Sequence, residues 1–190
     1  MNVQTVSAAR RRLSLIGATL LALAIAAPAS ALTYTREVYE GTDAGSYDDC
    51  GPTVDWTGSF GGRFSIRAGT GKDEAAFFAH DNFWFREVHV RESDGKVAII
   101  EGNLNFKETK ATRVDGSIFE FTAVFAGQVA MRDADGVLIL RDRGVIIDTI
   151  LFDTLGDETP GGVLIEFVSG SLHGQFPSFT TDAFCDYWNA

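Results

Sequence analysis

Cysteine, histidine and the signatures of common enzymes are scarce in this chain. The 190 residues include two cysteines and three histidines. CxxC and HExxH patterns are missing, His80 and His89 are nine positions apart, and His173 is remote, so a zinc site is not indicated. Nucleotide-binding glycine loops and the GxSxG turn of serine hydrolases are missing too. We therefore expect no metal and no cofactor.

Basic residues are also few. The chain has 16 Lys and Arg against 26 Asp and Glu, a formal net charge of −10. Three of the basic residues, Arg10 to Arg12, belong to an N-terminal segment that we expect to be removed, and their loss leaves −13. Such a charge repels phosphate backbones and anionic lipid head groups. The sequence thus disfavours nucleic-acid and membrane-surface binding, and its scattered acids are typical of a solvated surface.

Residues 1–31 have the pattern of a secretory signal peptide. The three arginines precede a mostly apolar run, Leu13 to Ala27, and Ala29-Ser30-Ala31 fits the small-residue cleavage rule. The run is short for a hydrocarbon core of about 30 Å, and no second span follows it. We expect a secreted or extracytoplasmic protein with no membrane span after cleavage. Both the Sec and the twin-arginine routes stay open.

The remaining residues, 32–190, are the size of one domain. Cys50 and Cys185 are their only cysteines, so one disulfide pairing exists. Because an even count in an exported chain favours oxidation, we predict this bridge. Metal ligation is the competing interpretation, but neither cysteine has a nearby histidine or a second cysteine.

The fold prediction starts from the stretch Ile118 to Asp153. Two long runs rich in Val, Ile and Phe are joined by Asp135-Gly136, a dipeptide suited to a tight hairpin turn. Similar turn signals recur about every twenty residues along the chain. The pattern predicts a single all-β domain, an antiparallel up-and-down barrel of seven or eight strands. A β-sandwich, with two short strands in each interval, is the alternative.

Glycines inside the predicted strands favour the barrel. In an up-and-down layout Gly58, Gly102, Gly127 and Gly144 fall at similar distances from one end of their strands. Glycine within a strand marks a bulge or bend, and a row of bends curls a sheet. In layout the prediction resembles lipocalins and the cyclase or dirigent-type barrels. The lipocalin Gly-x-Trp signature is absent because Val54 stands two residues before Trp56, so no family is assigned.

Alternation predicts which side chains face the core. In the third long strand, Ala98, Ile100, Leu104 and Phe106 share one face and Glu101, Asn103, Asn105 and Lys107 the other. In the fourth, Phe119, Phe121, Ala123 and Phe125 share the apolar face. Residues 145–152 are apolar on both faces, which suggests a cover outside as well, by the N-terminal segment or a partner chain.

The strand over residues 76–92 carries the predicted ligand site. If Val88 and Val90 face inward, the inward row continues through Arg86, Trp84, Asn82 and His80, and Glu87, His89 and Arg91 face out. Such a row suits a small-ligand site, with Asn82, Trp84 and Arg86 as binding residues and His80 as a proton-transfer group. The alternative is a shifted register that places Arg86 on the surface, which Phe83 and Phe85 support.

Asp148 and Glu166 form a second candidate pair. Each carboxylate alternates with apolar residues, and a carboxylate on an apolar face must find a partner or become protonated. With His80 they make up the predicted catalytic set. Exposure on an outer face is the competing interpretation.

Two functional hypotheses follow, and neither names a substrate. The first is an exported soluble barrel that binds a small, largely apolar ligand or an envelope partner. The second is a cofactor-free isomerase or cyclase acting in the barrel interior. A structural role is a third alternative. A cavity of roughly 300 Å³ or more lined by His80 and Arg86 favours either of the first two. Only an acid–base pair within hydrogen-bond reach in that cavity favours catalysis, and a filled core with Arg86 outside would reject both hypotheses. The sequence leaves the oligomeric state open.

Overall fold

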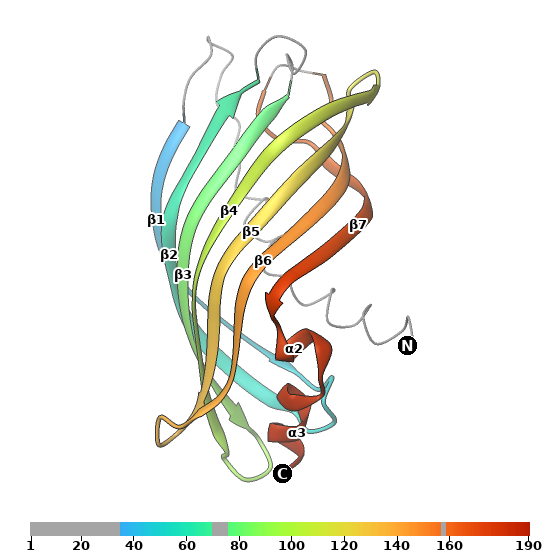
Figure 1. Ribbon diagram of the computed structural model, residues 1–190. Coiled ribbons are helices and arrows are strands. Elements are labelled where there is room, and N and C mark those ends of the chain that lie inside the picture. The colour runs from blue at the N-terminus through green and yellow to red at the C-terminus, as the bar shows by residue number, and fades with distance from the viewer. Residues whose placement is uncertain (1–34, 70–75, 157–158) are drawn as a thin grey trace.

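The protein folds as one antiparallel sheet followed by two short helices (Figure 1). The computed structural model describes residues 35–69, 76–156 and 159–190. The strands are β1 (Thr35–Tyr47), β2 (Val54–Ala68), β3 (Phe77–Arg91), β4 (Val97–Asp115), β5 (Ile118–Asp133), β6 (Leu138–Asp153) and β7 (Val163–Gln175), and the helices are α2 (Pro177–Thr180) and α3 (Ala183–Asn189). Strand order in the sheet follows chain order, which confirms the predicted all-β, up-and-down connection.

The predicted signal peptide, residues 1–31, lies outside the described residues. In the part of the chain that the structure describes, no helix is both long enough and apolar enough to span a membrane.

Each interval between turn signals is one long strand of 13–19 residues. The predicted Asp-Gly turns form: Gly95, Gly116 and Gly136 have φ of +74°, +49° and +81°, where glycine carries no Cβ penalty. In the β5–β6 turn the Asp133 carboxylate accepts two backbone N–H groups of the same turn, at 3.0 and 2.8 Å. The sandwich alternative predicted two short strands and an extra turn in each interval. The described strands are instead single and long.

A row of glycines crosses β5, β6 and β7. Gly127 lies opposite Gly144, and Gly144 opposite Gly174, with φ of +152°, +144° and +141°. A Cβ at any of the three would lie 2.2–2.3 Å from a backbone oxygen of the next strand. The predicted glycine row is therefore confirmed for Gly127 and Gly144. Gly58 and Gly102 occupy other registers, opposite Glu87 and Phe85.

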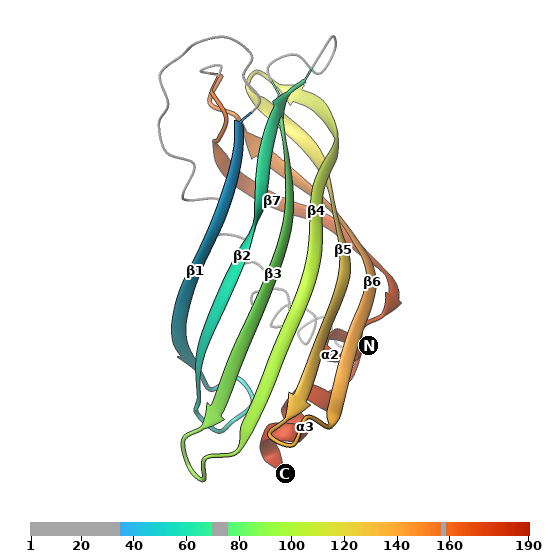
Figure 2. The same ribbon diagram turned by 90° about the vertical axis from the view of Figure 1, so that its left-hand side faces the viewer.

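The sheet curls into a deep trough without closing (Figures 1 and 2). Among the described strands β1 pairs only with β2, and β7 only with β6. The two edges diverge towards the end where α2 and α3 lie. Because seven strands alternate in direction, β1 and β7 run the same way, and direct closure would need a parallel pair. The strand number and curvature match the prediction, and hydrogen-bonded closure is not shown.

The two faces of the sheet differ in burial. We call the face against which α3 packs the inner face. It holds two buried clusters, one of Cys50, Val54, Ala98, Met131, Leu140 and Trp188, the other of Ala76, Phe78, Ala111, Phe119 and Phe121. We call the end of the trough with the first cluster the disulfide end, because that cluster contains Cys50. We call the end with the second cluster the pocket end, because Phe78 of that cluster also lines a pocket described below. The predicted core faces of β4 and β5 are confirmed, since their apolar rows point inward and the polar rows outward.

A disulfide joins Cys50, after β1, to Cys185, in α3. It spans 135 positions of sequence and confirms the predicted pairing. A bridge of this kind indicates an oxidising, extracytoplasmic environment. It also ties the connection that follows the first edge strand to the helix that follows the last one, so α3 closes the disulfide end and buries Trp188 completely.

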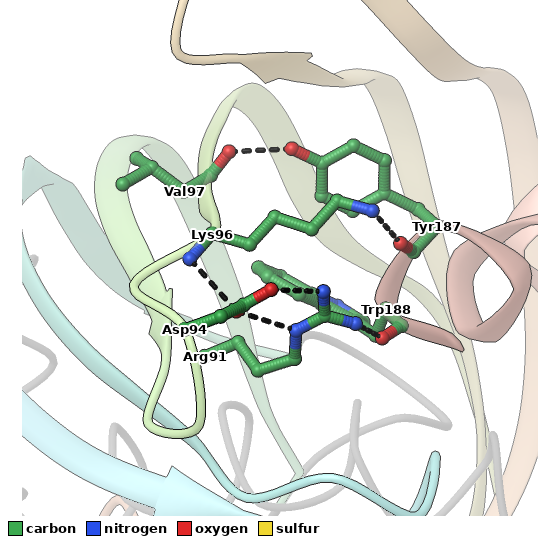
Figure 3. A network of polar contacts seen from close by, with 6 residues as sticks. All are labelled: Arg91, Asp94, Lys96, Val97, Tyr187 and Trp188. Carbon is green, nitrogen blue, oxygen red and sulfur yellow. Dashed lines mark hydrogen bonds and ion pairs between the residues drawn. The ribbon is translucent and has the colours of Figure 1, made fainter. Parts of the chain in front are cut away.

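Polar contacts hold the last turn of α3 on the β3–β4 hairpin (Figure 3). Arg91 donates to the backbone oxygen of Trp188, and Lys96 donates to that of Tyr187. The Tyr187 hydroxyl donates to the carbonyl of Val97 at 2.5 Å. Cations near the C-terminal carbonyls of a helix satisfy groups that have no partner within the helix.

Candidate functional site

The row predicted to face inward lies on the outer face of β3. Asn82, Trp84 and Arg86 are exposed, and Trp84 keeps 43% of its surface accessible. Glu87 and His89, predicted to face outward, lie on the inner face. The orientation predicted for this strand is therefore wrong. Arg86 lines a shallow outer depression of about 690 Å³ together with Val88 and residues of β1 and β2.

Pairing with β4 accounts for the reversed strand. The prediction placed Val88 and Val90 inside, which put Phe83 and Phe85 outside. In the sheet, Phe83 lies opposite Leu104 and Phe85 opposite Gly102, on the inner row of β4, so the two phenylalanines face inward. The row that follows them, through Glu87 and His89, must then face inward too.

The inward turn of β3 places a histidine beneath α3. His89 is buried, and its Nε2 lies 2.9 Å from the Glu87 carboxylate. Its Nδ1 lies 3.3 Å from the Tyr47 hydroxyl. The ring stacks on Trp56 and contacts Trp188 of α3. Every polar atom of the imidazole has a partner and aromatic rings cover it, so this group supports the disulfide end.

A second buried polar pair joins β1 to β3. The Tyr39 hydroxyl donates to Oδ2 of Asp81 at 2.6 Å. Burial raises the pKa of the Asp81 carboxyl and also that of Tyr39, whose ionisation would place a second negative charge beside Asp81. Oδ1 of Asp81 has no hydrogen-bond partner among the described residues.

His80, the predicted proton-transfer residue, sits in a small polar network near the pocket end. Its Nε2 accepts from the Asn105 amide at 2.7 Å and lies 3.4 Å from the Asn82 amide nitrogen. Asn105 also donates to the Asn82 oxygen at 2.6 Å. These contacts make Nε2 an acceptor and assign the ring proton to Nδ1. The structure therefore brings His80 and Asn82 together, as predicted, but on the outer face.

A pocket opens beside His80 because β3 and β4 separate there. Their pairing ends at His80 and Lys107. Beyond that point the Glu108 side chain replaces the ladder and accepts from the backbone N–H of Ala79 at 2.6 Å. The gap forms a cavity of about 400 Å³, lined by Ser65, Arg67, Phe78, Ala79, His80, Lys107 and Glu108.

The charges around this cavity, which we call the split-strand pocket, are mostly positive. Arg67 lies over the Phe78 ring, with its guanidinium carbon 4.8 Å from the ring centroid. Burial raises the pKa of the Glu108 carboxyl to about 7, offset only in part by the Ala79 hydrogen bond. The Glu108 carboxyl is therefore mostly protonated well below pH 7. The other two charged side chains of the lining, Arg67 and Lys107, are basic.

Sequence reasoning missed Glu108, Arg67 and Lys107. A signal for Glu108 was present, because it continues the inward row of Leu104 and Phe106, the same pattern that singled out Asp148. The alternation of polar and apolar residues does not show that β3 and β4 separate after His80 and Lys107, so the sequence did not predict a cavity there.

Asp148 and Glu166 do not join this site. Asp148 lies opposite Ala123 and Gly170 on the inner face of β6. Glu166 pairs with Leu151 on the outer face of β7 and is exposed. Since β4 and β5 separate β3 from β6, the structure does not bring the predicted catalytic set of His80, Asp148 and Glu166 together.

Chemically, the split-strand pocket suits binding better than proton transfer. His80 and Glu108 are not hydrogen-bonded to each other within the described ranges, where His80 contacts two asparagines and Glu108 a backbone amide. No group of three or more potential metal ligands occurs in the described part of the chain. Family models, curated proteins and solved structures were all compared with the chain, and none matches.

Proposed function

We propose that this protein is an exported binding protein that takes a small organic anion in the split-strand pocket. The observation that carries the proposal is the convergence of Arg67, Lys107 and His80 on one cavity of about 400 Å³. Ligand sites combine apolar walls with a few placed polar groups, and this volume falls within their usual range. The lining residues come from the neighbouring strands β2, β3 and β4, so the pocket does not depend on closure of the trough into a barrel.

The lining defines the ligand class. Arg67 offers a planar fork that matches a carboxylate or phosphate, and Lys107 adds a point charge. Phe78 supplies the apolar wall for the rest of the ligand. When Glu108 is protonated it is a hydrogen-bond donor, and when ionised it repels an anion. The ligand is thus a small molecule with one anionic group, less apolar than the sequence led us to expect.

Export follows from the predicted signal peptide and agrees with the disulfide. We favour binding over an isomerase or cyclase activity because His80 faces amides rather than a second titratable group. Its place at the pocket rim serves hydrogen bonding to the ligand.

The test is titration of the purified, oxidised protein with benzoate, acetate and inorganic phosphate at pH 6, followed by amide chemical shifts. We expect shifts centred on β3 and β4 near His80, saturable with at least one probe. Arg67→Gln should weaken binding about tenfold or more, the loss of one charge-assisted pair. Arg86→Gln, an exposed arginine on the same outer face, is the matched control. Equal affinity of the Arg67 variant and the wild type, or no saturable shift with any probe, would refute the proposal.

The pH dependence adds a second test. Raising the pH through about 7 ionises Glu108 beside Arg67, Lys107 and His80, and affinity for the anion should fall. Glu108→Gln should remove most of that dependence. An affinity that falls equally in both proteins would contradict the role of Glu108 in this pH dependence.

A further inference from the structure

The strand β7 is exposed along its whole length, on both faces, although it is rich in apolar residues. Six large apolar side chains keep 39–56% of their surface accessible: Val163, Leu164, Ile165, Phe167, Val168 and Leu172. Exposed apolar side chains gathered on one element mark interaction sites on soluble proteins. Among the described strands only β6 pairs with β7.

The opposite edge strand is protected and β7 is not. In β1, Arg36, Glu37, Glu40 and Asp43 place four charges along thirteen residues. Charged side chains on an edge strand discourage addition of a further strand. In β7 the only carboxylate is Glu166, and lysine and arginine are absent from it. The neutral edge is therefore the one open to strand addition.

Pairing with β6 fixes which β7 side chains share a face. Two register shifts leave Ile165 and Val168 as extra residues. Phe167 then lies opposite Ile150 and Leu172 opposite Ile146, both on the inner side. Glu166 and His173 lie opposite Leu151 and Val145, both on the outer side.

These faces make β7 complementary to itself. In an antiparallel pair of two β7 strands centred on Gly170, Leu172 of one strand falls opposite Phe167 of the other, with Val168 as the extra residue. His173 of one strand then falls opposite Glu166 of the other. Residues directly opposite one another must share a face, and both pairs satisfy that rule. Each two-fold related contact occurs twice, as an isologous interface requires.

We infer that β7 is a homodimer interface in which two copies of this chain pair antiparallel through β7 around Gly170, joining their sheets. A second copy carries the same negative charge, so the two can approach only along a strip that is nearly uncharged, and β7 provides it. An interface made of one strand pair and its apolar side chains is small. We therefore expect a weak dimer whose population depends on protein concentration.

The test is sedimentation velocity of the oxidised protein over about a hundredfold range of concentration, where we expect a reversible monomer–dimer equilibrium. Leu172→Lys should raise the dimer dissociation constant by about tenfold or more. Val38→Lys is the matched control, since Val38 is apolar, 82% exposed and on the other edge strand, and it should leave the constant unchanged.

A second set of variants is needed because Leu172→Lys could weaken the dimer simply by misfolding. Exchanging the charges of Glu166 and His173 provides it. Glu166→Lys changes an exposed residue, should keep the wild-type circular dichroism spectrum, and should weaken the dimer by facing His173. The double variant Glu166→Lys/His173→Glu should restore it. A monomer at every concentration would overturn the inference. So would equal effects of the Leu172 and Val38 variants, or a double variant no stronger than Glu166→Lys.

Discussion

The two ends of the trough are stabilised in different ways. At the disulfide end a covalent bridge, the helix α3 and a set of polar contacts cover the buried Trp188 cluster. At the pocket end aromatic packing around Phe119 and Phe121 holds the strands, and the neighbouring Glu108 opposes folding when it ionises. Binding sites commonly lie where a fold is not optimised for stability. The two ends therefore rely on different interactions, and the proposed ligand site lies at the end without the covalent bridge.

The largest expected effect is at the pocket end. Phe121 is buried and makes edge contacts with Phe78 and Phe152. Phe121→Ala should lower the free energy of unfolding by about 4 kcal/mol, because it removes a large apolar side chain and leaves a cavity. Chemical denaturation measures it. Val114→Ala, an exposed residue of the same end, is the control, and a loss below about 1 kcal/mol in Phe121→Ala would show that aromatic packing does not hold this end.

Removal of the disulfide tests the other end. The double variant Cys50→Ser/Cys185→Ser should lose about 3 kcal/mol, since a long loop is released in the unfolded chain. Hydrogen exchange sharpens the comparison: amides of α3 should lose protection first, while those around Phe121 should keep theirs up to global unfolding. Uniform loss of protection would mean that the two ends do not open separately.

Glu108 should give the two ends different pH responses. Its pKa is raised in the folded protein, so between about 4.5 and 7 the folded state binds more protons than the unfolded state. Stability from this group is therefore full below the unfolded pKa and is lost as the pH rises to about 7. Glu108→Gln should match the wild type at pH 4 and exceed its stability at pH 8 by up to about 3 kcal/mol. A wild-type stability that rises over this interval would contradict the assignment.

The smallest effect belongs to Asp94, beside the contacts that hold α3. Hydrogen bonds from Arg91 lower the pKa of the Asp94 carboxyl to about 2 (Figure 3). Its contribution to stability is present above the unfolded pKa of about 4 and is lost as the pH falls towards 2. Thermal unfolding of Asp94→Asn should therefore differ slightly from the wild type at pH 6 and converge with it at pH 2. Asp135→Asn, in the neighbouring hairpin, is the control for removal of an acid at this end.

Local chemistry explains why so much of the fold was predictable. Asp-Gly turns, β-branched runs and one pair of cysteines specify strand number, strand order and the disulfide with little help from distant contacts. The core faces of β4 and β5 were predictable for the same reason, because each strand has one clearly apolar row, such as Phe119 and Phe121 opposite Glu120.

The candidate site was less predictable because its strand carries apolar residues on both rows. On β3 the choice between Val88 and Phe85 depends on which row pairs with the inner row of β4. That choice moved Arg86 and Trp84 outside and brought Glu87 and His89 inside. Only the pairing with the neighbouring strands decides it.

By itself the sequence determined a long-stranded antiparallel meander, its turns and the single bridge, because these follow from residues close in the chain or from a pairing with no alternative. The tertiary structure alone decided the register-dependent features: the face of β3, the separation of β3 from β4 that makes the pocket, and the exposed edge β7. Each depends on how strands far apart in the chain compete for the same interior, and a period-two pattern is identical in either orientation.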